Sequence, residues 1–188
     1  MIVIDHRDSF TWNLVHLLQE HGPVRVVQAG EAAMVEPAPG EPIILSPGPG
    51  CPDDYPETRA LYLRWRGRNP ILGVCLGFQI ILAAEGGRIL PQPRVMHGYQ
   101  TIAEFLPESV AFRGIAPPLR VARYHSLMVD PEHIPPPFQC TAWDPQSKVP
   151  LAVEHRTQAV QAVQFHPDSF LTPMGSRIIA NVMDLFLV

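Results

Sequence analysis

The stretch Ile71-Leu72-Gly73-Val74-Cys75-Leu76-Gly77-Phe78-Gln79-Ile80-Ile81-Leu82 carries the strongest indication of the fold. Its first four residues are typical of a short buried strand, and the residues after Cys75 continue as an apolar helix. A cysteine flanked by Gly73 and Gly77 therefore lies where a strand gives way to a helix. This is the nucleophile-elbow arrangement with Cys in place of Ser, presented at a strained turn whose helix N-terminus favours a thiolate. A buried structural cysteine between packing glycines is the alternative that this motif alone leaves open.

Strand and helix patterns alternate around this stretch in the first half of the chain. Short apolar runs predict strands at residues 1–5, 24–28, 43–46 and 71–74. A first helix is predicted before Gly22 from apolar residues at helical spacing, which are Phe10, Leu14, Leu17 and Leu18. A second helix is predicted over residues 57–68, with Ala60, Leu61 and Trp65 facing inward. Short apolar strands between helices indicate a parallel sheet.

The pattern changes after about residue 87 to strand-like runs separated by proline-rich turns, at residues 94–105, 119–124, 138–143 and 159–165. This half is expected to add antiparallel strands. A final amphipathic helix over residues 173–187, with Pro173 in its first turn, presents to the core Ile178, Ile179, Val182, Met183 and Phe186. The predicted fold is α/β, a mixed, mainly parallel central sheet flanked by helices with a smaller antiparallel portion, in one domain over residues 1–188.

Composition and charge narrow the classes of function. The chain has 188 residues, 46% of them hydrophobic, which suits one domain with a sizeable core. Its net charge is -4 and its 14 Lys and Arg are scattered singly, so a nucleic-acid partner is not expected. The start shows no secretion signal, and the most apolar stretch, residues 71–84, is too short to span a membrane. A cytoplasmic protein is expected.

The cysteines and histidines do not form a known metal-binding pattern. Cys51, Cys75 and Cys140 include no CxxC pair and suit free thiols in a reducing compartment. The eight histidines include no HExxH motif. No metal or organic cofactor is expected.

A second candidate motif follows the last predicted strand, in Val163-Gln164-Phe165-His166-Pro167-Asp168. Strand alternation would put His166 and Asp168 on the same side, so that imidazole and carboxylate meet. Asp168 would then hold the useful tautomer of His166, which would take the proton of Cys75. Alone, the motif could equally be a turn with Asp168 or Ser169 capping the next helix.

Together these pieces resemble the class I (triad) glutamine amidotransferases, and specifically the small subunit shared by anthranilate synthase and aminodeoxychorismate synthase. The resemblance covers nearly the whole chain. It rests on ordered motifs: Asp5 with Asp8-Ser9-Phe10-Thr11 and Asn13-Leu14; Ser46-Pro47-Gly48-Pro49-Gly50; Gly73-Val74-Cys75-Leu76-Gly77 with Gln79; Met96-His97-Gly98; Tyr124-His125-Ser126-Leu127; and Gln164-Phe165-His166-Pro167. In order, they are far more specific than any one of them.

The resemblance implies a catalytic triad of Cys75, His166 and Asp168 that hydrolyses glutamine to glutamate and ammonia through a thioester. It also implies an oxyanion hole made by the backbone N–H groups of Gly48 and Leu76. By the same resemblance, the residues that hold glutamine are Gly48, Pro49, Gly50, Gln79, Ser126 and Leu127. The expected partner is a chorismate-binding synthase subunit, faced by Ser9, Phe10, Met96, His97 and Gly98.

The sequence departs from the family pattern at three places. Asp168 stands where the family usually has Glu, which puts the reach to His166 and the rate in question. Phe78 occupies a position that is often His. Tyr99-Gln100 follows Met96-His97-Gly98 where Lys and a hydroxyl residue are usual, which bears on the docking of the partner.

Two other functions stay open from the sequence. The same chemistry could serve another ammonia acceptor, as in nucleotide or carbamoyl-phosphate synthesis, although the Asp8-Ser9-Phe10-Thr11 start argues against it and no GxxxxGK[ST] loop occurs. Alternatively, the chain could be a non-catalytic regulatory or binding subunit that keeps the fold. A general cysteine peptidase is disfavoured by Gln79 and by the whole-chain resemblance. The sequence does not separate a role in tryptophan supply from one in folate supply.

Overall fold

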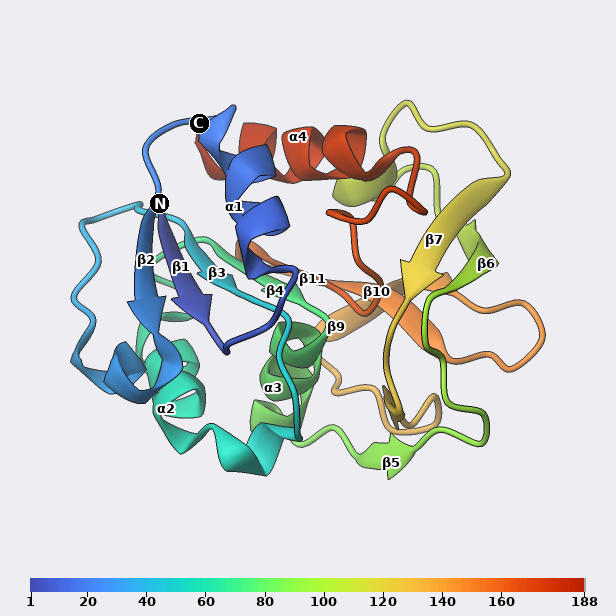
Figure 1. Ribbon diagram of the computed structural model, residues 1–188, viewed down its shortest axis with the longest axis horizontal. Helices are drawn as coiled ribbons and strands as arrows, with labels where there is room; N and C mark the ends of the chain where they lie inside the picture. Colours follow the sequence, from blue (N-terminus) through green and yellow to red (C-terminus); the bar gives the residue numbers. More distant parts are fainter. Residues whose placement is uncertain (188) are drawn as a thin grey trace.

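A nine-stranded mixed sheet runs through the protein, as seen in a computed structural model that describes residues 1–187 (Figure 1). Its order is β2-β1-β3-β4-β11-β10-β9-β6-β7. The strands are β1 (Ile2–Asp5), β2 (Arg25–Gln28), β3 (Ile43–Leu45), β4 (Ile71–Val74), β6 (Tyr99–Phe105), β7 (Leu119–Arg123), β9 (Phe138–Trp143), β10 (Pro150–His155) and β11 (Val160–Val163). A separate two-stranded antiparallel sheet pairs β5 (Ile89–Pro91) with β8 (Leu127–Val129).

The sheet has a parallel part and an antiparallel part that meet at β11. The strands β2, β1, β3, β4 and β11 run parallel to one another. From β11 onward, β10, β9, β6 and β7 pair antiparallel. The predicted mixed α/β sheet, with the parallel part the larger, is confirmed. The carboxyl ends of parallel strands are where such sheets build their sites, so β4 and β11 are the strands to follow.

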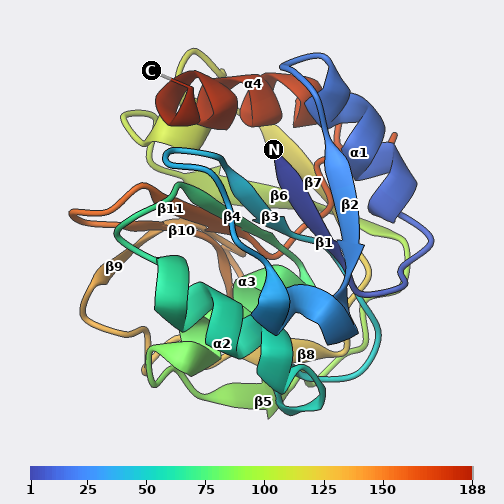
Figure 2. The ribbon, with the colours of Figure 1, turned by 90° about the vertical axis from the view of Figure 1, so that its left-hand side faces the viewer.

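Helices cover both faces of the parallel part. α1 (Thr11–Gln19) and α4 (Gly175–Phe186) lie on one face, and α2 (Pro56–Trp65) and α3 (Leu76–Ala84) lie on the other (Figures 1 and 2). Short 3-10 helices occur at Ala29–Met34, Pro52–Asp54 and Val110–Phe112. The strands carry apolar side chains to both layers: Val3 joins the core under α1 and α4, whereas Ile2 and Ile4 join the core above α2 and α3. Burial on both faces explains why these strands read as continuous apolar runs.

The predicted final helix is confirmed with a shifted start. α4 begins at Gly175 with Met174 as its N-cap, so Pro173 precedes the helix and is not in its first turn. The Gly175 N–H is bonded to Thr172 O at 2.9 Å, and a side chain at Gly175 would overlap the Pro167 backbone. The helix therefore starts where the turn after His166 can pack against it. All five predicted core residues of α4 are buried.

Other details of the prediction were wrong. Residues 94–98 are a loop, in which Gly98 has a φ of 76°, Met96 N bonds to His125 O in the β7–β8 connection and Gly98 N bonds to Arg123 O at the end of β7. Ala60 of α2 is exposed, and the buried face is formed by Thr58, Leu61 and Tyr62. β5, β8 and β10 were not predicted. β10 begins with Pro150 and carries a bulge against β9, which breaks the strand alternation.

A single domain over residues 1–188 stays a prediction, and Val188 lies outside the described residues. Within residues 1–187, the structure contains no helix of the length and apolar character that a membrane crossing requires.

Candidate active site

Cys75 lies at a strained turn between β4 and α3, as the sequence predicted. β4 ends at Val74 and α3 begins at Leu76, and Cys75 has a φ of 53° and a ψ of -100°. A non-glycine residue at positive φ is uncommon and is often retained for function. A side chain at Gly77 would overlap the Leu45 carbonyl, and one at Gly73 would come within 2.7 Å of the Gly77 backbone. The two glycines therefore let α3 approach β3 and β4 closely enough to form the turn.

The sheet order brings Cys75 and His166 together from distant parts of the chain. β4 and β11 are parallel neighbours, and the Cys75 N–H donates to Val163 O at 2.8 Å. Since β11 ends at Val163, the chain reaches His166 three residues later, at the same edge of the sheet. Cys75 is 6% exposed and His166 is 2% exposed. The nucleophile and base candidates thus lie beside one another at the carboxyl ends of adjacent strands.

His166 and Asp168 face each other across a turn, not along a strand as predicted. β11 ends before them, and residues 167–168 form a turn that continues toward α4. His166 Nδ1 lies 3.6 Å from Asp168 Oδ1, longer than an ordinary hydrogen bond. Both side chains are buried, and within residues 1–187 neither ring nitrogen nor carboxylate oxygen has a hydrogen-bond partner. Buried polar atoms are seldom left unpaired, so this pair is a candidate for function.

The surroundings of His166 favour its protonated form. Burial by itself lowers the pKa of His166, but the nearby Asp168 and Cys75 side chains outweigh it and raise the pKa to about 10. A protonated imidazole beside a thiol stabilises the thiolate through opposite charge. The arrangement can therefore place an imidazolium beside the Cys75 sulfur at neutral pH.

Two aromatic rings cover His166. The ring centroids of Phe10 and Tyr124 lie 4.9 and 5.0 Å from that of His166, both in edge-on geometry. The same two rings contact each other, with centroids 4.8 Å apart. Phe10 precedes α1 and Tyr124 follows β7, so segments far apart in the sequence close over the histidine and exclude water from it.

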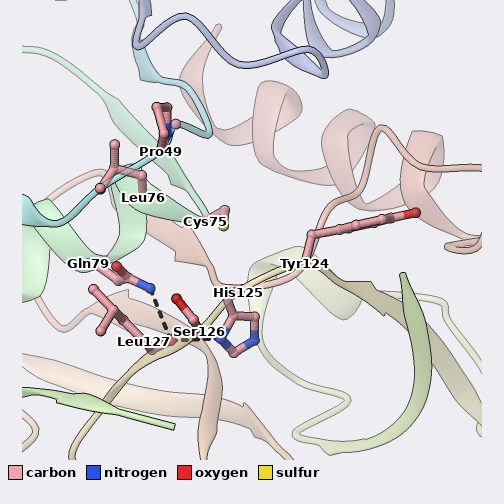
Figure 3. A pocket seen from close by; sticks show the side chains of 10 residues that line it. Pro49, Cys75, Leu76, Gln79, Tyr124, His125, Ser126 and Leu127 are labelled. Carbon is pink, nitrogen blue, oxygen red and sulfur yellow. Dashed lines mark hydrogen bonds between the residues drawn. The ribbon is translucent and has the colours of Figure 1, made fainter. Parts of the chain in front are cut away.

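A pocket opens beside Cys75 (Figure 3). Its volume is about 130 Å³, and since one water requires roughly 10–15 Å³ of such space, it suits a ligand of amino-acid size. Its lining consists of Gly48, Pro49, Gly50, Cys75, Leu76, Gln79, Tyr124, His125, Ser126 and Leu127. All of the residues predicted to bind glutamine or the oxyanion line this one pocket.

The loop that carries Gly48 is held by His6. The His6 N–H donates to Ser46 Oγ at 3.0 Å, and the ring contacts the Ser46 carbonyl and Thr58 Oγ1 at 3.0 and 3.1 Å. Burial lowers the pKa of His6 to about 4, so the ring is neutral at physiological pH. A side chain at Gly48 would overlap both His6 and Leu76. Only glycine lets this loop lie against the start of α3, where both backbones border the pocket.

A hydrogen-bond chain links the pocket wall to Cys75. Gln79 Nε2 donates to Leu127 O at 3.2 Å and to Gln164 Oε1 at 3.0 Å. Gln164 Nε2 in turn lies 3.6 Å from Cys75 Sγ. The sequence placed Gln164 in a motif without giving it a role, and in the structure it is completely buried and contacts both Gln79 and the Cys75 sulfur.

The chain is similar to known proteins in both sequence and fold. The family model described as glutamine amidotransferase class-I matches residues 2–185. The chain belongs to this family. The resemblance inferred from the motifs is thereby confirmed.

This class-I amidotransferase is similar in sequence to components of two synthases. It is 39% identical to "Aminodeoxychorismate synthase component 2" of Escherichia coli, with 97% of this chain and 98% of that protein covered. It is 40% identical to "Anthranilate synthase component 2" of Pseudomonas aeruginosa, with 97% and 94% covered. The solved structure of a glutamine amidotransferase from Thermotoga maritima matches with a TM-score of 0.71 at 16% identity, covering 99% of this chain and 81% of that one, which shows a shared fold.

The departures from the family pattern lie at different distances from the pocket. Phe78 is completely buried in the core beneath α3 and does not line the pocket. Tyr99 is 46% exposed and stacks beneath the Arg94 guanidinium. Gln100 donates to Leu171 O at 2.8 Å and so ties β6 to the segment after Asp168. Of these departures, only Asp168 is itself a member of the candidate triad.

The residues predicted to face a partner gather around Tyr124. Ser9, His97 and Gly98 are exposed, and Phe10 and Met96 are partly buried. Phe10 packs on the Tyr124 ring, and a side chain at Gly98 would lie 3.5 Å from the same ring. Two segments separated by more than eighty residues in the sequence thus meet beside the aromatic cover of His166.

Metal chemistry has no candidate ligand set in the part of the chain that is described, where no three His, Cys, Asp or Glu side chains group suitably for an ion. All three cysteines are free thiols. Burial raises the pKa of Cys140 to about 11, which suits a structural role for that residue.

Proposed function

We propose that this class-I amidotransferase is a glutaminase subunit, which releases ammonia from glutamine and delivers it to a chorismate-using synthase subunit. The observation that carries the proposal is the meeting of Cys75, at a strand–helix elbow, with His166 and Asp168 beside a pocket lined by every predicted glutamine-binding residue. Elbow, base and pocket come from three separate parts of the chain. Their coincidence supports acyl transfer over a structural role for Cys75.

In the proposed reaction, the Cys75 thiolate attacks the side-chain amide carbon of glutamine. The resulting oxyanion accepts hydrogen bonds from the N–H groups of Gly48 and Leu76, and losing one such donor costs about 3 kcal/mol of transition-state stabilisation. The amide nitrogen takes a proton from His166 and leaves as ammonia. His166 then draws a proton from water, which attacks the thioester and releases glutamate, regenerating Cys75.

Asp168 has the orienting role in this scheme. Its carboxylate favours the protonated form of His166 and fixes which ring nitrogen faces Cys75. The 3.6 Å separation from His166 is long for such a contact, but catalytic hydrogen bonds in ligand-free sites are often long and tighten when substrate binds. We therefore propose that Asp168 serves as the third triad member despite its shorter side chain.

The substrate is proposed to lie along the pocket from Gln79 to the Gly48–Gly50 loop. Gly48, Pro49 and Gly50 present backbone groups on one wall, and Ser126 and Leu127 do so on the other. Gln79, fixed by Leu127 O and Gln164, contributes a side-chain amide between the walls. Backbone and amide groups of this kind suit the polar ends of an amino acid.

The partner is proposed to dock where Ser9, Phe10, Met96, His97 and Gly98 surround Tyr124. The names of the two sequence relatives, both second components of synthases, support a chorismate-binding first component as that partner. The nearby segment after Asp168 exposes Phe170 (87%), an apolar side chain suited to such an interface. Because Phe10 and Tyr124 also cover His166, docking there would change the surroundings of the base and couple hydrolysis to synthesis. We propose that the complex works in the cytoplasm.

The two relatives serve different synthases at almost equal identity, so the proposal covers both anthranilate and aminodeoxychorismate formation. One observation favours a second candidate function, a non-catalytic regulatory subunit: the long His166–Asp168 separation. A further alternative, delivery to another ammonia acceptor, shares the site chemistry and differs only in the partner.

The test is ammonia release from glutamine by the purified chain, alone and with each chorismate-binding synthase subunit of the same organism plus chorismate. Stimulation by one of these partners, absent in Cys75→Ser, supports the proposal and identifies the acceptor pathway. Activity that no synthase partner changes would reject the proposed docking. No ammonia release with any partner would favour the non-catalytic candidate.

A further inference from the structure

Arg123 is a fully buried cation beside the pocket, and no motif assigned it a role. It ends β7, is 0% exposed, and follows Leu119 and Val121 on the same buried side of the strand. Its guanidinium donates to Asp144 Oδ2 at 2.6 Å and to Gln92 Oε1 at 3.2 Å. Asp144 is fixed in turn by the backbone N–H groups of Gln146 and Ser147. A buried charge held on several sides is costly to build, which calls for a reason beyond the ion pair itself.

The third donor of Arg123 fixes the orientation of His125. Arg123 Nε donates to His125 Nε2 at 3.1 Å. Because arginine has only donors, Nε2 must accept, and the proton of the neutral ring must lie on Nδ1. Burial and the Arg123 charge lower the pKa of His125 to about 3, which keeps the ring neutral. His125 Nδ1 then donates to Leu127 O at 2.7 Å (Figure 3).

Leu127 O is also the acceptor for Gln79, so the network continues to the nucleophile. Gln79 Nε2 donates to Leu127 O and to Gln164 Oε1, and Gln164 Nε2 contacts Cys75 Sγ. The donors of Arg123 set the direction of the His125 links, and the Leu127 carbonyl joins His125 to Gln79 by accepting from both. The side chains in this network are all 8% exposed or less: Gln92, Arg123, His125, Asp144, Gln79, Gln164 and Cys75.

We propose that Arg123 is a positioning residue for the glutamine site, which acts through His125 to hold the Ser126–Leu127 wall and the Gln79 amide in their binding geometry. This inference rests on the proposed function of the pocket. The backbone supports the same assignment, since Gln92 N bonds to Ser126 O at 2.8 Å while the Gln92 side chain accepts from Arg123. Arg123 thus controls both the side chain and the backbone of the pocket wall.

Arginine is suited to this role in a way that lysine is not. Its planar fork directs Nε, Nη1 and Nη2 to three partners at once, whereas a lysine ammonium concentrates its donors on one atom. Arg123→Lys therefore keeps the charge opposite Asp144 but gives up the contact with His125. A purely structural ion pair would tolerate this change, and a positioning residue would not.

The experiment compares wild type with Arg123→Lys, using Arg88→Lys as the matched control. Arg88 also pairs with a buried aspartate, Asp130, and the hydrogen bonds of its side chain go to Asp130 and not to the residues of the pocket network. Three quantities are measured for each protein: the KM for glutamine in ammonia release, the rate at which iodoacetamide alkylates Cys75, and the melting temperature. The KM reports substrate positioning, whereas alkylation by a small reagent reports the thiol itself.

The expected result for Arg123→Lys is a KM raised by roughly 10- to 100-fold, the scale of a misplaced binding group. The alkylation rate of Arg123→Lys should stay within about twofold of wild type. The KM and alkylation rate of Arg88→Lys should also stay within about twofold, because lysine keeps the charge opposite Asp130. A folded Arg123→Lys with the wild-type KM would overturn the proposal. A rise in KM matched by an equal fall in the alkylation rate would also overturn it, because the two changes together indicate general disruption of the site.

A second variant covers the case in which Arg123→Lys does not fold. Arg123→Met combined with Asp144→Asn removes both charges, which avoids an unpaired buried carboxylate. The same rise in KM is expected, and its absence overturns the proposal. Wild type provides the separate check on function: if it releases no ammonia under any condition, the proposed function fails and this inference with it, whereas an active wild type and an unchanged variant reject the inference alone.

Discussion

In the proposed mechanism Asp168 orients His166, and its carboxylate oxygen lies 3.6 Å from the ring nitrogen Nδ1. Replacing it with Asn keeps the shape and removes the charge. We expect Asp168→Asn to lower kcat by about 100-fold, the lower range for a general acid–base contribution. Asp168→Glu, which adds one methylene, serves as the control and should retain or increase kcat. An Asn variant as active as wild type would remove Asp168 from the triad.

The pKa of His166 predicts an alkaline limb in the pH–rate profile. Asp168 and Cys75 raise this pKa against the effect of burial, so the imidazolium persists through neutral pH and is lost only as pH rises through the raised value. Asp168→Asn removes one of the causes that raise it. The alkaline limb of kcat/KM should therefore move to lower pH in the variant. A limb that stays in place would show that Asp168 does not set this pKa.

Single residues differed in how far the sequence could predict their roles. Cys75, Gln79 and His166 were identified because their neighbours form recognisable patterns along the chain. Arg123 and Gln164 were given no role. Apart from His125, two residues from Arg123, their side-chain partners lie 21 to 89 positions away and become neighbours only in the folded chain. A signal existed for Arg123: strand alternation puts it on the same side as the apolar residues Leu119 and Val121, which is the buried side.

Among the helices and strands, the close approach of α3 to β3 depends on Gly77. A methyl group there would overlap the Leu45 backbone carbonyl. We expect Gly77→Ala to destabilise the fold by about 1–3 kcal/mol and to abolish most activity, because the helix start carrying the Leu76 N–H must shift. Urea unfolding and ammonia release measure the two effects. Gly30→Ala, where the added carbon meets no atom within 4 Å, is the control and should change neither.

Helices and strands were predicted correctly where the local pattern matched the tertiary environment. The buried parallel strands and the face of α4 follow from apolar periodicity alone. The loop at residues 94–98 was missed because its backbone partners, at the end of β7 and just after it, are distant in sequence. β10 was missed because Pro150 and a bulge hide its alternation. Residues 166–168 were predicted as strand from their local alternation. In the structure they form a turn whose Pro167 backbone lies against Gly175, a residue distant enough in sequence to be missed.

The whole molecule should lose stability in acid through its buried neutral histidines. Burial lowers the pKa of His6 to about 4 and that of His125 to about 3, below the ordinary value of 6.5. Between these values the unfolded chain binds protons at these two histidines that the folded chain does not. Their contribution to stability is therefore complete above pH 6.5 and falls as pH drops toward the folded pKa values. Melting temperatures measured from pH 7 to pH 5 should fall, and His6→Gln should reduce the slope. An unchanged slope would contradict this assignment for His6.

The proposed partner surface is a property of the whole molecule. Phe170 is 87% exposed beside the candidate triad, and Leu63 is 42% exposed on α2, across the sheet from α1 and α4. We expect Phe170→Ala to weaken binding of the synthase subunit by roughly 10-fold, typical of a buried aromatic contact. Leu63→Ala should leave the affinity unchanged. Calorimetric titration measures both, and equal affinities for the two variants would place the interface elsewhere.

The proposed function depends above all on attack by Cys75 on the side-chain carbonyl of glutamine, which covalent trapping can reveal. The chain is treated with a diazoketone analogue of glutamine, with and without its synthase partner, and the modified peptide is located by mass spectrometry. We expect a single adduct on Cys75, suppressed by excess glutamine and absent in His166→Asn. Modification spread over Cys51 and Cys140 as well, or no adduct on Cys75 with any partner, would contradict the proposed mechanism.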